Sequence, residues 1–465
     1  MKYIPKYDSN FKPAYLELAS FKEKVAKEAK KGHLGLCLER TKGYNYVYEM
    51  DVFLDNCGHD EENYKISERI VKTLLWLAGG YKIYVSGSKN IYNRLKEDYS
   101  ANGKRSFDFH FMSRVYESEF EVIYCDKLPA LKEQSETMKN GLDGNRIGFD
   151  AGGSDRKVSA SRDGKVLFSD ETVWFPKINS DPKYHFDGIK DSIERAAQFL
   201  PTIDSIGVST AGIVVDNKIM VASLFLKVNE EDFDKYVKNI YIDVKNEFEK
   251  KYNKKIPLVV ANDGDVTALA GAIELNTDKV LGIAMGTSEA AGYIGEGGSF
   301  KGWLNELAFA PVDFNEKAMV DEWSGDYGCG VKYFSQDSII KLAENAGIKF
   351  DPEFSPARKL KYVQDLYENG TAQEQEVAED IYSDLGTYLG YTLAYYAHFY
   401  DMKHVLLLGR VVSGKGGNRI LTRARHVLRD EFPHLASVIT LHMPDEKSRR
   451  VGQSIAAASL PTIKH

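Results

Sequence analysis

A first segment that could bind phosphate joins an apolar strand to a glycine-rich turn. Residues 146–154 read RIGFDAGGS, so the strand ends at Asp150 and the turn holds Gly152, Gly153 and Ser154. Glycines at such a turn let backbone N–H groups approach phosphate oxygens with no Cβ in the way. Asp150 can hold a metal-bound water, and Ser154 can donate a hydrogen bond to a phosphate. Taken alone, the segment fits an ordinary tight hairpin equally well.

The same pattern occurs a second time further along the chain. Residues 280–288 read VLGIAMGTS, in which an apolar strand meets Gly286, Thr287 and Ser288 before the chain returns as another strand. Two such hairpins on one chain predict a pair of clamps for a triphosphate, one from each of two lobes. The pair is far more specific than either hairpin.

A third segment places carboxyl groups at the end of a strand. Residues 258–270 read LVVANDGDVTALA, so an apolar strand delivers Asn262 and Asp263, and a helix begins near Asp265. A carboxylate at the carboxyl end of a strand, facing a crevice between lobes, can take a proton from a substrate hydroxyl. The alternative is an Asx turn with an Asp helix cap, and the segment alone leaves both interpretations open.

A fourth segment has the spacing of a P-loop and departs from it at one position. In residues 405–417, VLLLGRVVSGKGG, Gly409 and the pair Gly414-Lys415 have the GxxxxGK spacing. The next residue is Gly416, where a P-loop has the magnesium-binding Ser or Thr, and too few residues follow to build the usual parallel sheet. We therefore expect a strand and glycine turn that pack beside an adenine and ribose.

The elements that must position these segments begin near residue 145. Residues 132–145 are polar and end in glycines, which indicates a connector. Alternating strand and helix patterns then run to the end of the chain, which is typical of an α/β protein.

Residues 1–145 predict a hairpin, a helix and a strand. The hairpin strands are 34–39 and 44–53, the helix is 67–78 with one apolar face, and the last strand is 81–85. The numbers of basic and acidic residues in this segment are nearly equal, which argues against a DNA-binding arm.

Bulk properties restrict the class of protein further. A length of 465 residues predicts two or three units. The sequence has no apolar stretch long enough to span a membrane and no signal-peptide pattern at its start, so we expect a soluble, cytoplasmic protein. The 4 cysteines form no CxxC pair, which argues against a disulfide framework and a local zinc clip. The net charge of −7 argues against nonspecific nucleic-acid binding through the whole surface.

Taken in order, these segments resemble the ROK family of sugar kinases and sugar-responsive repressors, in the actin-like ATPase (hexokinase-type) superfamily. The similarity covers roughly residues 146–460. The matching segments are 150–154 (DAGGS, for the phosphate motif DxGGT), 206–212 (IGVSTAG, for the sugar-side GxGxPG), 262–265 (NDGD, for NDAN with its catalytic Asp), 286–288 (GTS, for the second phosphate motif GTGxGGG) and 408–413 (LGRVVS, for the adenosine-side GGGVS). The resemblance implies an α/β, two-lobed actin-like (ribonuclease H-like) fold with an additional N-terminal α/β segment.

The resemblance also implies a domain organisation. We expect an N-terminal extension over 1–145, a first lobe over 146–260 and a second lobe over 261–446. A C-terminal helix within 447–465 is expected to pack back on the first lobe.

Two sugar-side motifs of the family are altered. The family's GExGH is represented by residues 305–309, NELAF, in which Glu306 matches the sugar-binding glutamate and Phe309 replaces the histidine that contacts sugar and ligates zinc. The family's CxCGxxGCxE is represented by residues 322–331, in which Cys329 remains and Val331 replaces the closing sugar-binding glutamate. One thiolate without partners cannot make a four-coordinate zinc site, so we expect no structural zinc. The loss of the histidine and of one glutamate removes two contacts to sugar hydroxyls, which argues against glucose as the substrate.

The activity that the resemblance implies is phosphoryl transfer from ATP, with Mg²⁺, to a hydroxyl of a sugar or sugar-like polyol, with Asp263 as the base. The implied nucleotide and phosphate residues are Asp150 (through a magnesium-bound water), Gly152, Gly153, Ser154, Gly286, Thr287, Ser288, Gly409 and Ser413. The implied substrate residues are Thr210, Gly212, Asn262 and Glu306. The expected partner is a small sugar-like molecule, with neither nucleic acid nor membrane, and the resemblance leaves room for a homo-oligomer.

Two other functions stay open. A sugar- or nucleotide-sensing regulator without turnover would keep this fold, and the altered sugar motifs suit it. However, the family's repressors carry an N-terminal winged helix-turn-helix, which the hairpin-first segment does not resemble, and a sensor has no need of Asp263 as a base. The N-terminal segment could instead recruit a partner through Tyr44, Tyr46 and Tyr48 on one strand face, although such a stripe is more often packed core.

Overall fold

The computed structural model describes residues 1–134, 136–137, 142–221, 223–444 and 446–463. By their internal contacts these residues form two compact units. Unit 1 comprises Met1–Gln134, Ile283–Ala291 and Trp303–Met443, and unit 2 comprises Ser135–Gly282, Gly292–Gly302 and Pro444–His465. Among the helices of the described residues, none is long and apolar enough to cross a membrane.

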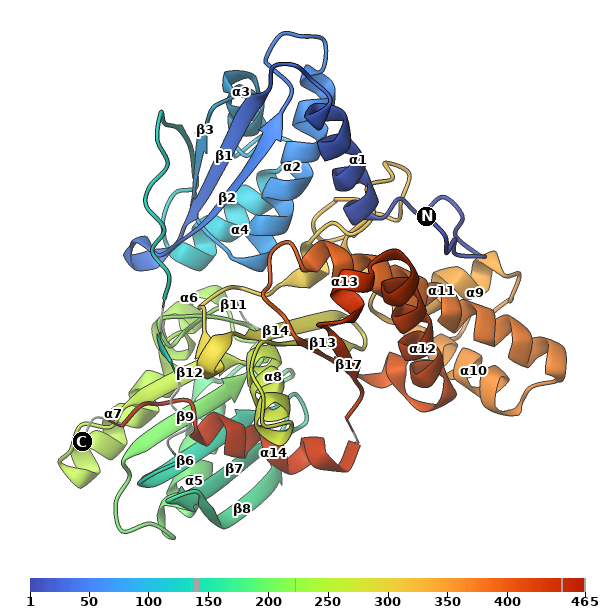
Figure 1. Cartoon of the computed structure of the whole chain (residues 1–465). Coiled ribbons are helices and arrows are strands. Elements are labelled where there is room, and N and C mark those ends of the chain that lie inside the picture. Colours follow the sequence, from blue (N-terminus) through green and yellow to red (C-terminus); the bar gives the residue numbers. More distant parts are fainter. Residues whose placement is uncertain (135, 138–141, 222, 445, 464–465) are drawn as a thin grey trace. The chain divides into compact units, whose positions relative to one another are not determined.

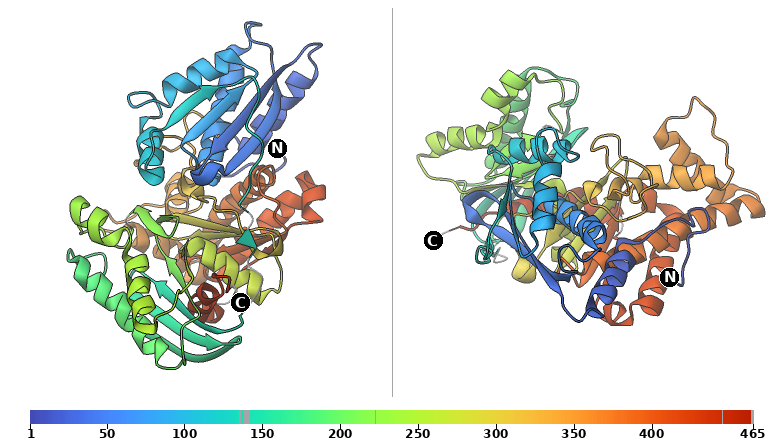
Figure 2. Two further views of the ribbon diagram at one scale, coloured as in Figure 1. Left: turned by 90° about the vertical axis from the view of Figure 1, so that its left-hand side faces the viewer. Right: turned by 90° about the horizontal axis from the view of Figure 1, so that it is seen from above.

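Unit 1 begins with a four-stranded sheet in the order β2-β1-β3-β4 and the helices that accompany it (Figures 1 and 2). The strands are β1 (Gly32–Glu39), β2 (Asn45–Val52), β3 (Lys82–Ser86) and β4 (Glu121–Tyr124), and the helices are α1 (Ala14–Ala26), α2 (Asp60–Leu77), α3 (Lys89–Asp98) and α4 (Ser106–Tyr116). β1 pairs antiparallel with β2 and β3, and β3 pairs parallel with β4. The predicted hairpin, helix and strand are confirmed in β1, β2, α2 and β3, whereas α1, α3, α4 and β4 lie outside the prediction. Residues 1–134 are called the N-terminal segment below.

The core of the N-terminal segment lies between β1 and α2. β1 is buried at every position from Leu34 to Leu38, so both of its faces are covered. α2 begins with the acidic residues Asp60, Glu61 and Glu62, whose charges favour the positive end of a helix. The chain turns away after α2 because Gly79 takes a φ of +82°, a conformation that glycine adopts without strain.

The tyrosine stripe of β2 packs inside unit 1. The Tyr46 hydroxyl donates a hydrogen bond to the Phe399 carbonyl at 3.2 Å, and its ring lies 5.3 Å from that of Trp303. The Tyr48 ring lies 5.8 Å from that of Phe399. Tyr46 and Tyr48 of the stripe therefore pack against other residues of unit 1.

A second four-stranded sheet, in the order β14-β13-β16-β17, lies largely in unit 1 together with a helical layer. Its strands are β13 (Val280–Met285), β14 (Glu289–Ile294), β16 (His404–Leu408) and β17 (Thr440–His442). The helices are α9 (Gln336–Asn345), α10 (Pro356–Asn369), α11 (Ala372–Tyr396), α12 (Gly414–Glu431) and α13 (Pro433–Ala436), with short 3₁₀ turns η4 (Leu307–Phe309), η5 (Gly330–Lys332) and η6 (Arg410–Val412). α11 starts at a capping box formed by Thr371 and Glu374, which satisfies backbone N–H groups at its first turn.

Unit 2 is built on a five-stranded sheet in the order β12-β9-β6-β7-β8. The strands are β6 (Asn145–Ala151), β7 (Asp155–Arg162), β8 (Lys165–Val173), β9 (Ser205–Thr210) and β12 (Leu258–Asn262), with short strands β5 (Glu136–Thr137), β10 (Ile213–Val215), β11 (Lys218–Val221) and β15 (Ser299–Phe300). The helices are α5 (Pro182–Ala197), α6 (Glu230–Asp232), α7 (Ile240–Tyr252), α8 (Asp263–Glu274) and α14 (Glu446–Ala458). β6 pairs antiparallel with β7 and parallel with β9, which pairs parallel with β12. The carboxyl ends of β6, β9 and β12 therefore meet at one edge of the sheet.

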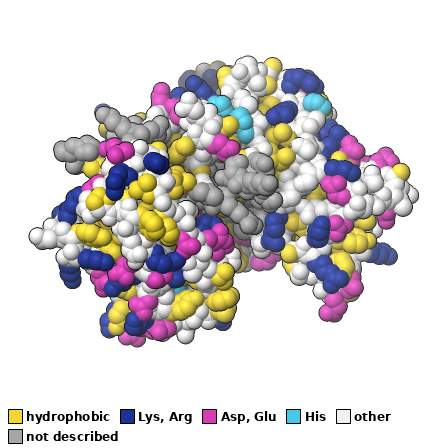
Figure 3. Space-filling model, turned by 90° about the horizontal axis from the view of Figure 1, so that it is seen from below, with side chains coloured by type: hydrophobic (Ala, Val, Ile, Leu, Met, Phe, Trp, Pro, Cys, Tyr) yellow, Lys and Arg dark blue, Asp and Glu magenta, His cyan; other side chains and the backbone are white. Residues whose placement is uncertain are grey.

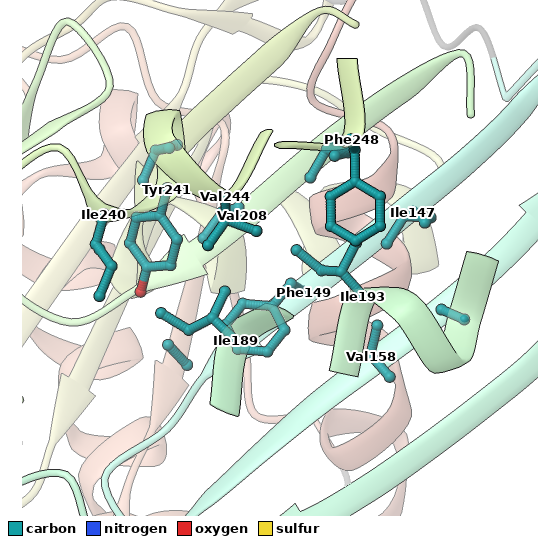
Figure 4. Close-up of a cluster of buried hydrophobic side chains, with 14 of the residues drawn as sticks. Ile147, Phe149, Val158, Ile189, Ile193, Val208, Ile240, Tyr241, Val244 and Phe248 are labelled. Carbon is teal, nitrogen blue, oxygen red and sulfur yellow. The ribbon is translucent and has the colours of Figure 1, made fainter. Parts of the chain in front are cut away.

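The core of unit 2 lies between this sheet and helices α5 and α7 (Figure 4). Phe149 and Val208 come from the sheet, Ile193 from α5 and Phe248 from α7, and all of them are at most 2% exposed. Burial of side chains of this size stabilises a fold by about 1.5–3 kcal/mol each. This core holds the strand ends that carry the predicted site residues.

Two glycines allow α14 to lie directly on the sheet of unit 2. A Cβ at Gly148 would be 1.7 Å from the Ser454 carbonyl oxygen, and a Cβ at Gly207 would be 1.7 Å from the Ala457 carbonyl oxygen. Any larger residue at either position would push the helix away from β6 or β9.

The division into units does not follow the boundaries predicted at residues 145, 260 and 446. The N-terminal segment shares unit 1 with residues 303–443 because α2 and its neighbours make extensive contacts there. Residues 135 and 138–141 of the predicted connector, and 464–465 of the predicted C-terminal helix, lie outside the described residues. The domain limits stay a prediction.

The surface carries charges of both signs. On the face shown in Figure 3, the acidic and basic side chains of the described residues are interspersed. This distribution agrees with 61 basic and 68 acidic residues in the sequence. Such a surface does not create a strong field of one sign.

Candidate functional site

The turn between β6 and β7 is held in place through its carbonyl groups. The indole N–H of Trp174 donates a hydrogen bond to the Gly152 carbonyl at 2.7 Å, and the Trp174 backbone N–H donates to the Ser154 carbonyl at 3.2 Å. Trp174 is itself 1% exposed. These contacts fix residues 152–154 without using their N–H groups, which are the donors that a phosphate needs.

Asp150 is a buried carboxyl one residue before the end of β6. It is 3% exposed, and the Lys157 ammonium lies 3.8 Å from its Oδ2. Burial raises the pKa of Asp150, and the charge of Lys157 acts in the opposite direction. A magnesium ion held by phosphates and water needs one or two nearby carboxylates rather than a dedicated cage. This single carboxylate at a phosphate-type turn fits that requirement, and the described residues hold no group of three or more metal-ligating side chains.

Asp263 is the first residue of α8, directly after β12. Burial, together with the nearby charge of Asp150, raises its pKa to about 6. Its side chain is still partly exposed. A carboxyl with a pKa close to the working pH is suited to exchange a proton with a substrate, and perturbed values of this kind gather at functional sites.

Asn262 fixes the start of α8. Its Oδ1 accepts a hydrogen bond from the Gly264 N–H at 2.8 Å, so it is the helix cap, and its Nδ2 donates to the Gly212 carbonyl at 2.7 Å. The segment therefore forms an Asx turn, with Asn262 rather than an aspartate as the helix cap, and the Asp263 side chain stays partly exposed. The two hydrogen bonds of Asn262 thus connect the loop after β9 with the first turn of α8.

The other predicted substrate residues after β9 differ in their surroundings. Gly212 takes a φ of +104°, and a Cβ there would be 2.5 Å from the Val221 carbonyl oxygen, so the loop requires glycine. Thr210 is 0% exposed, and its hydroxyl accepts a hydrogen bond from the Tyr241 hydroxyl at 2.9 Å. Its side chain thus packs in the core, and its substrate-binding role stays a prediction.

The second phosphate-type turn, in unit 1, lies against the predicted adenosine-side turn. Gly409 has a φ of +96°, and a Cβ there would be 2.2 Å from the Met285 carbonyl oxygen at the end of β13. The Arg410 guanidinium donates to the Thr287 hydroxyl at 2.8 Å. Ser413 occupies the N-cap position of α12. Unit 1 therefore brings both predicted nucleotide segments together at the ends of β13 and β16.

Arg410 is a functional candidate that the motifs did not single out. Guanidinium groups are frequent partners of phosphates because their planar donors match phosphate geometry. Its only signal in the sequence is a basic residue inside the glycine turn after β16.

Glu306 lies at the start of η4 and is held by its backbone. Its N–H donates to the Trp76 carbonyl at 2.9 Å, and the preceding Asn305 N–H donates to the Leu77 carbonyl at 2.9 Å. The Asn305 side chain accepts a hydrogen bond from the Tyr400 hydroxyl at 2.9 Å. The residue that matches a sugar-binding glutamate is thus anchored on the end of α2.

Glu289 is a second carboxyl near Glu306 that sequence reasoning missed. It is 4% exposed, and among the described residues neither of its carboxyl oxygens has a hydrogen-bond partner. A Cβ at Gly330 would be 2.3 Å from its Oε2 and 2.4 Å from the Leu307 carbonyl oxygen, so the carboxyl lies against η4 and η5. Burial raises its pKa well above the usual range, and the charge of Glu306 acts in the same direction. Its signal in the sequence is a lone acidic residue directly after the second turn.

The segment that resembles a zinc motif has its side chains engaged elsewhere. Cys329 is 0% exposed, and burial raises the pKa of its thiol. Glu322 accepts a hydrogen bond from Lys332 at 2.6 Å, and the Ser324 hydroxyl donates to Asp321 at 2.7 Å. Phe309 lies 4.3 Å from the Trp76 ring.

A family model described as the ROK family matches residues 146–457 of this chain. A search of curated proteins finds no match. One similar solved structure is a ROK hexokinase from Thermus thermophilus, with 16% identity and a TM-score of 0.48 over 68% of this chain and 97% of that chain. A second is a ROK family transcriptional regulator homologous to the MLC protein of E. coli, with 18% identity and a TM-score of 0.49 over 69% of this chain and 79% of that chain. A third is a ROK family glucokinase from Streptomyces griseus in complex with glucose and AMPPNP, with 18% identity and a TM-score of 0.42 over 68% of this chain and 99% of that chain. Identities this low carry no conclusion about the substrate. The matched residues span the strands that hold the site, and the fold is the α/β, actin-like ATPase fold of that family.

Proposed function

We propose, from the premise that this chain belongs to the ROK family, that it transfers the terminal phosphoryl group of ATP to a hydroxyl of a sugar or sugar-like acceptor. The observation that carries the proposal is Asp263. This carboxyl begins a helix at the carboxyl edge of a sheet, beside Asp150, and its pKa is raised to about 6. A carboxylate that is ionised at neutral pH and still basic enough to accept a proton suits a hydroxyl nucleophile.

The phosphate groups would be held by backbone donors and by cations of the chain. The N–H groups of residues 152–154 and 286–288 would bind phosphate oxygens, and Arg410, beside Thr287, would add a charged donor. Mg²⁺ bound to ATP would supply further charge neutralisation, and Asp150 would hold it through a water molecule. Gly409 and Ser413 would lie on the adenosine side.

The acceptor would be oriented by Asn262, Asp263 and Glu306. Asp263 would accept the proton of the attacking hydroxyl as the bond to phosphorus forms, and Asn262 would keep the start of α8 in place through its contact with Gly212. Glu306 would bind a hydroxyl of the ring. Thr210 is buried beside Tyr241, and its predicted contact with the acceptor remains part of this proposal.

The test is ADP release with magnesium and ATP against a panel of hexoses, amino sugars and polyols. Asp263→Asn should lose about 10²–10⁴ in stimulated rate while ATP binding, measured by calorimetry, stays intact. Asp234→Asn, an exposed aspartate of the same unit, is the matched control and should keep the native rate. If ATP binds and no compound on the panel stimulates turnover, or if Asp263→Asn is fully active, the proposed reaction is wrong.

A second candidate is a sugar-sensing regulator without turnover. The observation that favours it is Phe309, which packs on Trp76 at the position where the family resemblance expects a polar sugar contact. A compound that binds with ATP present, changes the protein's melting temperature and is not phosphorylated would support the regulator over the kinase.

A further inference from the structure

Six charged side chains of unit 1 are buried together where α2 and α4 meet residues 321–331. Each of them is at most 3% exposed. They are Glu68, Arg69, Lys72, Arg105, Asp108 and Asp326. Three are cationic and three are anionic, so the cluster balances its own charge, which a buried set of ions requires.

Asp326 is the only member of the cluster that lies outside the N-terminal segment. Its Oδ2 accepts a hydrogen bond from Arg69 at 3.0 Å and lies 3.9 Å from the Lys72 ammonium, and its Oδ1 lies 2.8 Å from Arg105. Burial by itself lowers the pKa of Lys72, but Asp108 and Asp326 raise it on balance, so this lysine keeps its charge. A buried carboxylate of the 321–331 segment is thus neutralised by cations of the N-terminal segment.

The same helix holds the neighbouring segment that carries Glu306. The last carbonyls of a helix have no partner inside the helix, and those of Trp76 and Leu77 accept the N–H groups of Glu306 and Asn305 at 2.9 Å each. The Trp76 indole N–H donates to Asp108 in the ionic cluster at 2.6 Å, and its ring lies 4.3 Å from Phe309. One helix therefore connects the ionic cluster with the backbone of residues 305–309.

We propose that α2 is a positioning element for the acceptor side of the site: its ionic cluster with Asp326 and its two terminal carbonyls hold residues 305–309, and with them Glu306, in place of a bound metal. The role of Glu306 in acceptor binding rests on the proposed function, whereas the contacts of α2 with residues 305–309 and with Asp326 do not. Residues 322–331 resemble a zinc-binding segment in which Cys329 is the one cysteine that remains, and the cluster supplies the cross-link that such a segment needs. The N-terminal segment thereby helps to position the residue that would bind the acceptor, Glu306.

The first test is hydrogen–deuterium exchange of the full-length protein without ligands. Asp326→Asn, which keeps the shape and removes the charge, should speed exchange of the Asn305 and Glu306 amides at least about tenfold, as expected for the loss of one charge-assisted hydrogen bond. Amides of β6 and β9 in unit 2 should be unchanged. The matched control is Asp384→Asn: Asp384 is also buried, at 4% exposure, and binds the N–H groups of Lys6 and Tyr7 instead. Equal exchange in both variants would mean a global loss of stability and overturn the proposal, as would slow exchange in a folded Asp326→Asn protein.

Two further measurements keep the proposal testable if Asp326→Asn does not fold. Trp76→Phe keeps an aromatic ring against Phe309 and removes the hydrogen bond to Asp108, and it should raise exchange of the same two amides by a smaller factor. Treatment of the native protein with EDTA should leave their exchange unchanged, whereas faster exchange would show that a metal holds the segment and would overturn the proposal.

The activity readout separates this proposal from the proposed function. With the panel sugar that most stimulates ADP release, Asp326→Asn should raise the acceptor KM about tenfold or more with little change in the KM for ATP, and Asp384→Asn should change neither. If no sugar stimulates turnover, the kinase assignment fails, while the exchange experiment still decides whether α2 positions residues 305–309. If the acceptor KM is unchanged although the amides exchange faster, α2 holds the segment without acting on the site, and the positioning role is refuted.

Discussion

Asp263 is expected to set the pH dependence of phosphoryl transfer. Its pKa is raised to about 6 by burial and by the charge of Asp150, whereas an ordinary aspartate titrates near about 3.9. A general base acts only when it is deprotonated, so kcat/KM should fall about tenfold per pH unit below this value and level off above it. At pH 5 the rate should therefore be about a tenth of the plateau.

Asp150→Asn tests the cause of this shift. The substitution removes the neighbouring negative charge and keeps the shape, so the pKa of Asp263 should fall and the midpoint of the profile should move to lower pH. Total activity should also fall, because Asp150 is expected to hold the magnesium ion through a water molecule. The midpoint is therefore taken from the shape of the pH–rate curve rather than from its height. Asp155→Asn removes a charge beside the phosphate turn and should leave the midpoint in place.

The assay is ADP release at constant ionic strength, with the acceptor well below its KM, from about pH 4.5 to pH 8. A rate that is flat between pH 5 and pH 7 would refute the assignment of Asp263 as the base. A midpoint that moves to higher pH in Asp150→Asn would refute the electrostatic explanation, because the removal of a negative charge cannot raise the pKa of a nearby carboxyl.

Three predictions concern stability, each measured by urea unfolding. Asp263 binds its proton more tightly in the folded than in the unfolded protein, so protonation of Asp263 stabilises the fold. This contribution is complete below about pH 4 and is lost as the pH rises through about 6. Asp263→Asn should therefore stabilise the protein at pH 8 by about 1–2 kcal/mol, allowing for partial solvent screening, and should have no such effect at pH 4. Gly148→Ala places a Cβ 1.7 Å from the Ser454 carbonyl oxygen and should cost about 1–3 kcal/mol, whereas Gly452→Ala, where the nearest atom is 3.7 Å away, should be neutral or stabilising. Glu289→Gln tests the protonation state of Glu289, because burial raises the pKa of this carboxyl well above its usual range. A change in stability at pH 7 of less than about 1 kcal/mol is expected for a neutral carboxyl, whereas a large gain would mean that Glu289 is ionised.

The parts of the site that the sequence could predict depend on short-range patterns. A strand followed by a glycine turn, or by Asn262 and Asp263 before a helix, is defined within about ten residues, and the structure forms these elements where they were expected. Helix α3 of the N-terminal segment was harder to predict because its apolar face is narrow. It buries only Ile91 and Leu95, too few positions for a helical period to stand out.

The parts that could not be predicted depend on pairs of residues far apart in the chain. Arg410 acquires its position beside Thr287 through a contact across 123 residues, and no local pattern indicates which basic residue reaches that turn. Glu289 is likewise an ordinary acidic residue in the sequence. Only the packing of η4 and η5 around it creates a carboxyl that is 4% exposed.

Phe309, at the position of the family's histidine, is accommodated by aromatic residues that lie far from it in the sequence. In the sequence it stands where the family resemblance expects a histidine, which by itself indicates only the loss of a polar contact. A phenylalanine at that position needs apolar neighbours, and the N-terminal segment supplies them: Trp76 lies 4.3 Å from its ring, and Phe107 lies 5.8 Å away. Asp326 likewise depends on the N-terminal segment, because it is bound by Arg69, a residue 257 positions earlier. Removal of the N-terminal segment would leave Phe309 without these aromatic neighbours and Asp326 without its cations. The N-terminal segment is therefore part of the packing of unit 1 rather than an appended module.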